Sequence, residues 1–478
     1  MSNTSQVGAR SGDHLSLGTV LTFVSATIPG AALLGMLAVF LPRFFTHFHM
    51  TLYAVGGALA LVRTVDTFLV DLPIGWAMDK FRTRFGRYRP WFVVGAPITG
   101  IGIFMLFNPP ANMTTPYLAG WYMFLWVGLS MMTIAHSAWG ANLANNYNDR
   151  SRLFGWMIAV GIIGPVVLNL SPALSHGKFG PGIAADVPII GWIIIGVSVV
   201  TTTIVSIVVR EPVAPTAPRA RGSLGDYWNV IANPTALRLV LGDLFLTLGP
   251  GLTAPIYLFF FNQSKGFSIG GATVLLLCYS AAGIVWAPLW ARVARSLGKH
   301  RTLQIACVFY AIFQTSLMAI RGPQFPLTAL FMFLVGGCAS AFLFLVRAML
   351  ADYADQLRLE QSANRAGLVY SFVGVTQKLG ASLNTVISFS ILGWVGFNPD
   401  EHAHNTAHAI FGLNMTYLFA PIIFVVLGGL FFLGYKLDAK RHAEIRAALD
   451  ARDSAVEHES VADDLTGEPP LPPAAAAE

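Results

Sequence analysis

Twelve apolar stretches, each long enough to cross a lipid bilayer as a helix, dominate the sequence. About 20 helical residues span the hydrocarbon core of a bilayer, and stretches of that length recur along most of the 478 residues. Only 11% of the residues are charged and 55% are hydrophobic, whereas ordinary soluble domains are about 25% charged. We therefore predict an all-α membrane protein with twelve transmembrane helices. Their approximate ranges are 17–41, 51–78, 91–107, 117–139, 153–174, 187–209, 235–261, 269–291, 302–320, 326–350, 368–395 and 410–435.

The distribution of lysine and arginine predicts the orientation of the chain. If both termini face the cytoplasm, the inside segments hold 22 of the 30 basic residues and the outside loops hold four. Basic residues concentrate on the cytoplasmic side of membrane proteins, which favours an even number of spans with both termini inside. The polar residues before Leu17 include one arginine, and the apolar stretch that follows is too long for a removable signal peptide. We expect a multi-pass protein of the inner, plasma membrane.

Several classes of function are disfavoured. The net charge is +6, but the basic residues lie in short loops, which indicates lipid headgroups and not nucleic acid. The three cysteines lie inside apolar stretches, which predicts neither disulfides nor a zinc site. The histidines of the loop at 402–408 are interpreted as solvated residues and not as metal ligands. The motifs G-x-x-x-x-G-K-[ST], H-E-x-x-H and G-x-S-x-G are absent from the sequence, so we predict no enzyme, no ATP-driven pump and no cofactor.

An internal echo indicates a duplicated bundle. The loop after the second stretch reads GRYR at 86–89, and the loop after the eighth reads GKHR at 298–301. Two six-helix pseudo-repeats joined by a Pro-rich linker fit the major facilitator fold, in which substrate binds between the halves near the middle of the membrane. The expected segments are a cytoplasmic N-terminus at 1–16, six-helix bundles at 17–209 and 235–436, a cytoplasmic central linker at 210–234, and a cytoplasmic, partly disordered tail at 437–478.

Two aspartates in the second stretch are an unusual feature for a membrane helix. A carboxylate there costs about 2.5–3.5 kcal/mol on insertion scales, and helical geometry places Asp71 about 12 Å and Asp66 about 20 Å deep. One interpretation is a structural ion pair between Asp66 and Arg63, three residues apart. The other is that at least one aspartate carries a proton, because loss of water favours the neutral form of a carboxyl. In a regular helix the two acids point about 140° apart, unless Pro73 kinks or unwinds the preceding turn.

Three stretches carry a family resemblance. The first contains D-x-x-x-G-W at Asp71–Trp76 and R-x-R-x-G-R-Y-R-P-W at Arg82–Trp91. The second is ANLANNYNDRSRLFGW at Ala141–Trp156. The third is Met349–Pro399, with two aspartates three residues apart, an Arg-x-Gly and the Lys-Leu-Gly that begins at Lys378. Together they resemble the glycoside-pentoside-hexuronide:cation symporter family, the melibiose permease group of the major facilitator superfamily. The resemblance implies uptake of a sugar or glycoside driven by an ion gradient.

The cation site departs from the family pattern. The family draws carboxylates from helices I, II and IV, whereas here helix I has no acid and helix IV has His136 near the expected position. On helix II, Asp71 matches the second family carboxylate, and Thr67, beside Asp66, matches the first. Helix V shows no arginine of the kind that grips galactosides, so galactoside specificity is not implied. Because Na⁺ needs several oxygen ligands and a proton needs one carboxylate, we expect H⁺ as the coupling ion, with Na⁺ as the alternative.

Four residues are predicted to couple the ion to transport: Asp66, Asp71, His136 and Lys378. Lys378 is the single charged residue of its stretch, and we expect it to pair with a helix II aspartate across the interface of the halves. The alternative is that it extends to the membrane surface. His136 either joins a proton relay with the aspartates, donates to a sugar hydroxyl, or only packs.

Substrate and gate residues complete the predicted site. Sugar sites combine aromatic faces with hydrogen-bonding side chains, although tryptophan is also common at membrane interfaces. The expected substrate-binding residues are Arg63, Thr67, Trp76, Trp126, Trp139, Trp286, Tyr370 and Lys378. The charged loops are predicted to form a cytoplasmic gate that assembles in the outward-open state and parts in the inward-open state. Its residues are Asp79, Arg82, Arg84, Arg87, Asp149, Arg150, Asp352, Asp355 and Arg365.

The sequence thus predicts a monomer in the lipid bilayer that imports a small molecule, a sugar, glycoside or uronide, by cation symport with alternating access. The alternative on the same fold is a carrier of a lysolipid or other anionic amphiphile. Its headgroup would be held by Arg63, Arg347 and Lys378.

Overall fold

The computed structural model describes most of the membrane region. The described residues are 15–46, 48, 50–81, 83, 85–143, 147–161, 163–166, 183–211, 233–361, 366–400, 403–435, 437–438 and 440–452. Most of the predicted N-terminus and linker, and the end of the predicted tail, lie outside these ranges.

The N-terminal half contains the first six predicted passes. The first pass consists of α1 (Leu17–Ser25), α2 (Thr27–Gly35), the π-helical turn η1 (Met36–Phe40) and α3 (Leu41–Thr46). The second consists of α4 (Leu52–Val65), the π-helical turn η2 (Asp66–Val70) and α5 (Asp71–Lys80). The others are α6 (Arg89–Phe107), α7 (Thr115–Leu143), α8 (Tyr147–Gly161) and α10 (Ile183–Val208).

The C-terminal half contains the other six. Its first pass consists of α12 (Pro234–Thr253), α13 (Tyr257–Phe259) and the π-helical turn η3 (Phe260–Ser264). The others are α14 (Ile269–Leu297), α15 (Lys299–Ala319), α16 (Phe325–Gln361), α17 (Ala366–Trp394) and α18 (Ala407–Leu430). A further helix at residues 440–452 follows the last pass.

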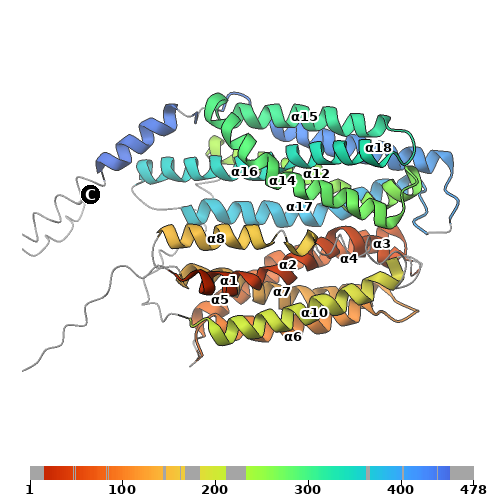
Figure 1. The fold of residues 1–478 in the computed structure, drawn as a ribbon, viewed down its shortest axis with the longest axis horizontal. Helices are drawn as coiled ribbons and strands as arrows, with labels where there is room; N and C mark the ends of the chain where they lie inside the picture. Colours follow the sequence, from red (N-terminus) through yellow and green to blue (C-terminus); the bar gives the residue numbers. More distant parts are fainter. Residues whose placement is uncertain are drawn as a thin grey trace, which may run out of the picture.

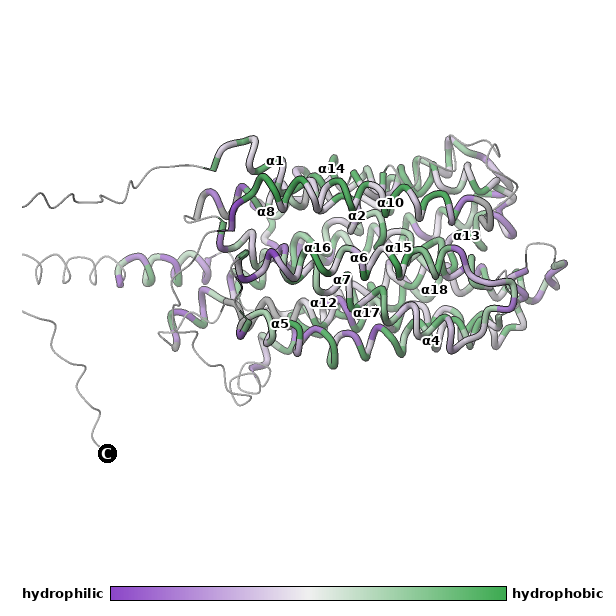
Figure 2. Tube along the Cα trace, turned by 90° about the horizontal axis from the view of Figure 1, so that it is seen from below, coloured by the Kyte–Doolittle hydropathy of each residue, from purple (hydrophilic) through white to green (hydrophobic). Residues whose placement is uncertain are grey.

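The prediction of an all-α membrane protein is confirmed. Ten helical stretches among the described residues are long and apolar enough to cross a membrane. The other two predicted passes correspond to α8, which is 15 residues long, and α17, which is 29 residues long and richer in polar residues. The helices run roughly along one axis, with α1–α10 in one half of the molecule and α12–α18 in the other (Figure 1). Hydrophilic residues gather mainly at the two ends of the bundle (Figure 2).

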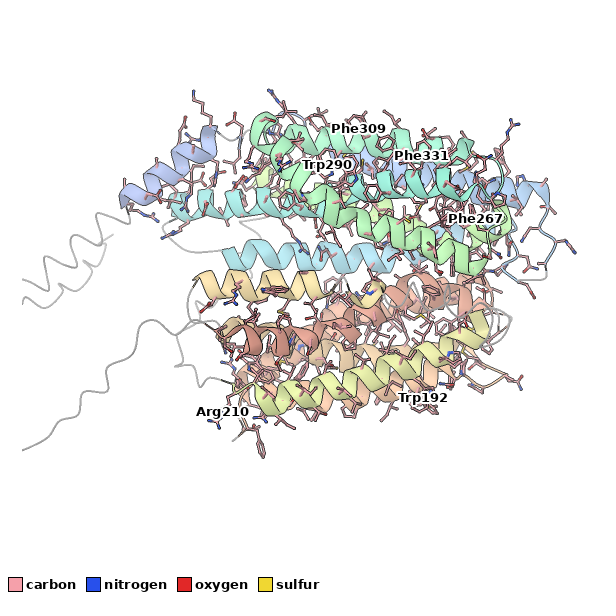
Figure 3. The ribbon with its side chains drawn as sticks, viewed as in Figure 1. Trp192, Arg210, Phe267, Trp290, Phe309 and Phe331 are labelled. Atoms are coloured by element: carbon pink, nitrogen blue, oxygen red, sulfur yellow. The ribbon has the colours of Figure 1, made fainter. Side chains whose placement is uncertain are left out.

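Apolar side chains also cover the outside of the bundle, as expected for a surface in contact with lipid. Trp192 of α10 is 56% exposed and Phe309 of α15 is 44% exposed, and both lie on outer faces of the bundle (Figure 3). Inside each half, glycines let helices approach closely. A Cβ atom on Gly128 of α7 would lie 2.5 Å from the backbone nitrogen of Thr99 in α6. Small residues at such crossings are typical of membrane helix packing.

Several helices continue beyond their apolar stretches. The tenth predicted span ends at 350, whereas α16 continues to Gln361. The eighth ends at 291, whereas α14 continues to Leu297 and ends at Gly298, whose φ of 84° closes the helix. Hydropathy marks where a helix leaves the lipid, and local capping decides where it ends.

A π-helical turn interrupts the second pass at the predicted acids. The amide of Asp71 donates to the carbonyl oxygen of Asp66, five residues earlier. Pro73 lies in the first turn of α5, where it has no amide hydrogen to donate and its ring crowds the carbonyl four residues before it. The unwinding expected before Pro73 therefore takes the form of a π turn. Because the hydrogen bond joins residues five apart, the two aspartates lie about one turn apart along one side.

The two halves touch where α3 ends and α4 begins, which we call the far end. The near end is the opposite end, where α1 begins and α5 ends. Arg43, one of the four basic residues counted in the outside loops, is 3% exposed. Its Nη1 donates to the carbonyl oxygen of Leu258 at 3.0 Å and its Nη2 to Oδ1 of Asn262 at 2.9 Å. Next to this contact, a Cβ atom on Gly56 of α4 would lie 3.2 Å from Cβ of Phe389 in α17.

Candidate substrate and ion-coupling site

Asp66 is fully buried at the start of the π turn and has three polar partners. Arg63 Nη1 donates to its Oδ2 at 3.1 Å, and Ser130 Oγ of α7 donates to its Oδ1 at 3.0 Å. Lys378 Nζ of α17 lies 4.0 Å from its Oδ2. Buried carboxylates persist when they are paired and hydrogen-bonded. This aspartate therefore ties α4 to α7 and faces the opposite half.

Asp71 forms an ion pair with Lys378. The lysine is the partner of both aspartates, because the π turn brings Asp71 to the side on which Asp66 already lies. The side chain of Asp71 is 16% exposed, and its Oδ1 accepts no hydrogen bond within the described part of the chain. With Arg63 included, the cluster holds two negative and two positive charges, and a bound proton would leave one positive charge in excess.

Arg63 links this charge cluster to an aromatic ring. Its guanidinium carbon lies 3.5 Å from the ring centroid of Trp126, and the residue is 8% exposed. A guanidinium over an indole face is a favourable cation–π contact, strongest where water is excluded. Arg63 is thus held by the carboxylate of Asp66 on one side and by the Trp126 ring on the other.

A pocket lies between the two halves beside this arginine. It has a volume of about 110 Å³. The N-terminal half contributes Leu34, Leu37, Ala38, Leu59, Arg63, Tyr122 and Trp126, and the C-terminal half contributes Gly251, Ala254, Pro255, Ala381, Asn384 and Thr385. Asn384 Oδ1 and Trp126 Nε1 are buried and make no hydrogen bond to other described residues. The pocket therefore offers a guanidinium, an amide oxygen and an indole N–H to a small polar molecule.

His136 lies elsewhere in the N-terminal half. Its Nε2 is 3.0 Å from the carbonyl oxygen of Phe23, and its ring stacks on that of Phe23 with centroids 4.2 Å apart. It follows Ser130 by six residues on α7, so it points about 120° away from the side that meets Asp66. The structure places His136 between α7 and α1 and does not bring it to the aspartates.

Two of the predicted tryptophans each pack inside their own half of the molecule. Trp139 is 0% exposed and meets the ring of Phe23 edge-on at 5.5 Å. Trp286 lies 5.7 Å from Trp290, and a Cβ atom on Gly337 would lie 2.5 Å from its ring, which places it between α14 and α16. Neither lines the pocket between the halves.

The other predicted substrate residues have different surroundings. Trp76 is 61% exposed, with Lys80 Nζ 4.8 Å from its ring centroid. Thr67 is buried, and its Oγ1 donates to the carbonyl oxygen of Arg63 at 2.8 Å. Trp126 alone of the predicted aromatic residues with described side chains lines the pocket. The side chain of Tyr370 lies outside the described part.

The predicted gate residues of the N-terminal half have local partners. Asp149 is 4% exposed and accepts the backbone N–H of Leu15 at 3.3 Å. Arg87 Nε donates to the carbonyl oxygen of Met78 at 3.1 Å. The gate residues Arg82, Arg84 and Arg365, and the side chains of Asp79 and Arg150, lie outside the described part.

The gate aspartates of α16 pair with α15 and with the helix at 440–452. Asp352 Oδ2 lies 2.6 Å from Lys299 Nζ at the start of α15. Asp355 Oδ2 lies 3.1 Å from His442 Nε2 and 3.7 Å from Arg446 Nη1, both in the helix at 440–452.

The sequence interpretation missed four residues. Ser130 and Asn384 carry common polar side chains, and their roles depend on which way α7 and α17 are turned. Glu211 accepts the backbone N–H groups of residues 87–89 at 2.9–3.1 Å, a long-range contact that sequence cannot show. Asp243 of α12 is 4% exposed inside a membrane helix. The cost of burying a carboxylate was a signal that could have identified it.

Residues 22–439 match the sequence profile of the family described as MFS/sugar transport protein. The chain belongs to this family. Relatives of the transporter include the glucuronide carrier protein homolog of Escherichia coli, 24% identical and covering 92% of this chain and 96% of that protein. The isoprimeverose transporter of Lactiplantibacillus pentosus is 23% identical, covering 90% of each chain. The human sodium-dependent lysophosphatidylcholine symporter 1 is 23% identical, covering 86% of this chain and 81% of that protein.

Solved structures confirm the predicted major facilitator fold of the transporter. The nucleoside transporter NupG superposes with a TM-score of 0.63 at 16% identity, covering 88% of this chain and 98% of that chain. The D-xylose-proton symporter superposes with a TM-score of 0.62 at 14% identity, covering 88% and 96%. At these identities the likeness shows the fold alone, and the twelve-helix, two-half architecture agrees with it.

Proposed function

We propose that the transporter imports a sugar, glycoside or uronide together with a proton by alternating access. The observation that carries the proposal is the contact of Lys378, from the C-terminal half, with Asp71 and its approach to Asp66, both from the N-terminal half. A proton can break this charge contact between the halves. Such a contact links the binding of the ion to the relative movement of the two halves.

Asp71 is the aspartate that we propose to bind the proton. It is more exposed than Asp66, and one of its oxygens accepts no hydrogen bond among the described residues. Protonation of Asp71 would remove its attraction for Lys378, and the freed ammonium could then approach Asp66. Asp66, with its three partners, would remain ionised and anchor Arg63 and Ser130.

A proton suits this site better than Na⁺. The carboxylate of Asp71 already faces the ammonium of Lys378, and a metal ion there would meet a like charge. The neighbouring helix α7 contributes the hydroxyl of Ser130, which is directed to Asp66. A proton requires one carboxylate oxygen, which Asp71 offers.

The pocket between the halves is the proposed substrate site. The Trp126 face, the Arg63 guanidinium and the Asn384 amide match the combination of stacking and hydrogen bonding that sugars require. A uronide carboxylate would in addition pair with Arg63. Because the two halves of one chain form the pocket, we propose that the monomer is the transporting unit.

We propose that both termini lie in the cytoplasm. The near end then faces inward, and the contacts of Arg43 at the far end close the outer side of the pathway. This arrangement supports an inward-facing state, in which we expect the cytoplasmic gate to part. Asp352 pairs with Lys299 of α15 and Asp355 pairs with His442 of the helix at 440–452, which fits that state.

A lysolipid or another anionic amphiphile is the second candidate substrate. The 23% identity to a lysophosphatidylcholine symporter over 450 residues favours it. A phosphate group would pair with Arg63 at the same pocket. The two candidates differ in whether an acyl chain is required for uptake.

Reconstituted vesicles distinguish the proposals. We expect accumulation of a labelled glucuronide or isoprimeverose when the pH gradient is directed inward, and collapse of accumulation when an ionophore dissipates it. Accumulation driven equally well by a Na⁺ gradient at constant pH would refute proton coupling. Movement of a labelled lysolipid, without uptake of any sugar in the panel, would replace the first substrate class by the second.

A further inference from the structure

A second buried carboxylate lies in the membrane region of the C-terminal half. Asp243 follows the start of α12 at Pro234 by nine residues, which places it about 14 Å along the helix. The residue is 4% exposed, and its Oδ2 is hydrogen-bonded to Oγ1 of Thr376 in α17. An acid at this depth is costly and marks a functional position by default.

Few charges surround Asp243. Arg347 of α16 interacts with it electrostatically, without the direct contact of an ion pair among the described residues. On α12 itself the other charged residue is Arg238, which is exposed and reaches the carbonyl oxygen of Gly434 at 3.4 Å. The sequence of α18 has no Asp, Glu, Lys or Arg, and its one histidine lies in its first turn. A neutral hydroxyl is therefore the direct partner of a buried acid.

The helix that supplies this hydroxyl also supplies the lysine of the coupling site. Thr376 and Lys378 are two residues apart on α17, so they point about 160° apart around the helix. Thr376 faces Asp243 in its own half, and Lys378 faces Asp71 in the other half. A movement of α17 changes both contacts together.

We propose that Asp243 is a second proton-binding carboxylate of the transporter, protonated while Thr376 is its partner and ionised when Arg347 comes into contact. Its place in a transport cycle rests on the proposed proton coupling. The protonated form suits the present surroundings, because an ionised carboxylate with one neutral hydrogen bond is poorly compensated away from water. Contact with the Arg347 guanidinium would supply the charge that an ionised Asp243 needs.

Infrared spectra of the purified full-length protein test the proposal directly. A protonated carboxyl has a carbonyl band that is separate from the absorption of carboxylates. We expect one such band to disappear in Asp243→Asn and to shift in Thr376→Val, because the hydrogen bond to that carboxyl is lost. Asp450→Asn is the matched control, because this aspartate is 67% exposed and lies outside the membrane helices. It should leave the band unchanged.

The outcomes separate this inference from the proposed function. If Asp243→Asn changes only carboxylate absorption at every pH at which the protein is folded, Asp243 binds no proton and the inference is wrong. If Asp243→Asn does not fold, an unshifted spectrum of Thr376→Val overturns the inference in its place. Uptake driven by a pH gradient in the same preparation, with no Asp243 band, overturns this inference alone. The band without gradient-driven uptake supports the proton site and contradicts proton symport.

Discussion

Replacing Asp71 by asparagine removes the carboxylate that faces Lys378 and preserves the size of the side chain. One proton that enters with each substrate molecule across one pH unit supplies about 1.4 kcal/mol, equivalent to about tenfold accumulation. We expect Asp71→Asn to lower this ratio to about one, because no proton would be carried. Exchange of labelled for unlabelled substrate should continue in part, because exchange needs no net movement of protons.

The same substitution should have a limited effect on stability. Removing one partner of a fully buried ion pair costs about 3–5 kcal/mol. The side chain of Lys378 is 31% exposed, and its Nζ lies 4.0 Å from Asp66, which remains as a partner. We therefore expect a loss of about 1–2 kcal/mol in the free energy of unfolding, toward the range of exposed pairs.

The assay is uptake into reconstituted vesicles with an imposed pH gradient, followed by counterflow exchange in the same vesicles. Asp450→Asn serves as a control that removes an exposed carboxylate and should accumulate substrate like the unchanged protein. Lys378→Gln combined with Asp71→Asn should regain the lost stability but not the accumulation. Full accumulation by Asp71→Asn would remove this residue from the coupling role and refute the reasoning.

Three further substitutions test other parts of the structure. Asp66→Asn leaves the guanidinium of Arg63, which is 8% exposed, without its carboxylate. We expect the free energy of unfolding to fall by about 3–5 kcal/mol, and an unchanged midpoint of thermal unfolding in detergent would contradict the anchoring role of Asp66. Gly86→Ala should lower the same midpoint, because φ is 120° and the new Cβ would lie 2.2 Å from Oε2 of Glu211. An unchanged midpoint would show that this position does not require glycine. Trp126→Ala should raise KM at least tenfold, which corresponds to a loss of about 1.4 kcal/mol in binding free energy. An unchanged KM would mean that the substrate binds elsewhere.

Much of the helical architecture was predictable because its signals are local. A run of about 20 apolar residues has few alternatives to a membrane helix, and the observed helices contain nearly all of each predicted span that the structure describes. The ends were less predictable. Polar residues continue a helix as readily as apolar ones, so α16 extends to Gln361, well past the end of its apolar stretch.

The candidate site was predictable only in part. Charged residues inside apolar stretches are easy to identify, because burying a charge is costly. Three of them, Asp66, Asp71 and Lys378, were predicted on this ground, and the structure brings them together. Trp126 and Trp139 are thirteen residues apart on one helix and look alike in the sequence, yet one lines the pocket and the other lies inside the N-terminal half. For His136 the sequence left a proton relay, a sugar contact and plain packing open, and the structure turns its ring toward Phe23.

The sequence by itself determined that the chain forms apolar helices with a few costly charges inside them, because lipid imposes that on each segment separately. The tertiary structure decided which side of each helix faces which neighbour. The meeting of Asp71 with a lysine about 300 residues away requires a π turn before Pro73 and the packing of α17 against α4. Both depend on contacts between distant segments, and the rotation of a helix about its axis is settled by those contacts and not by its own composition.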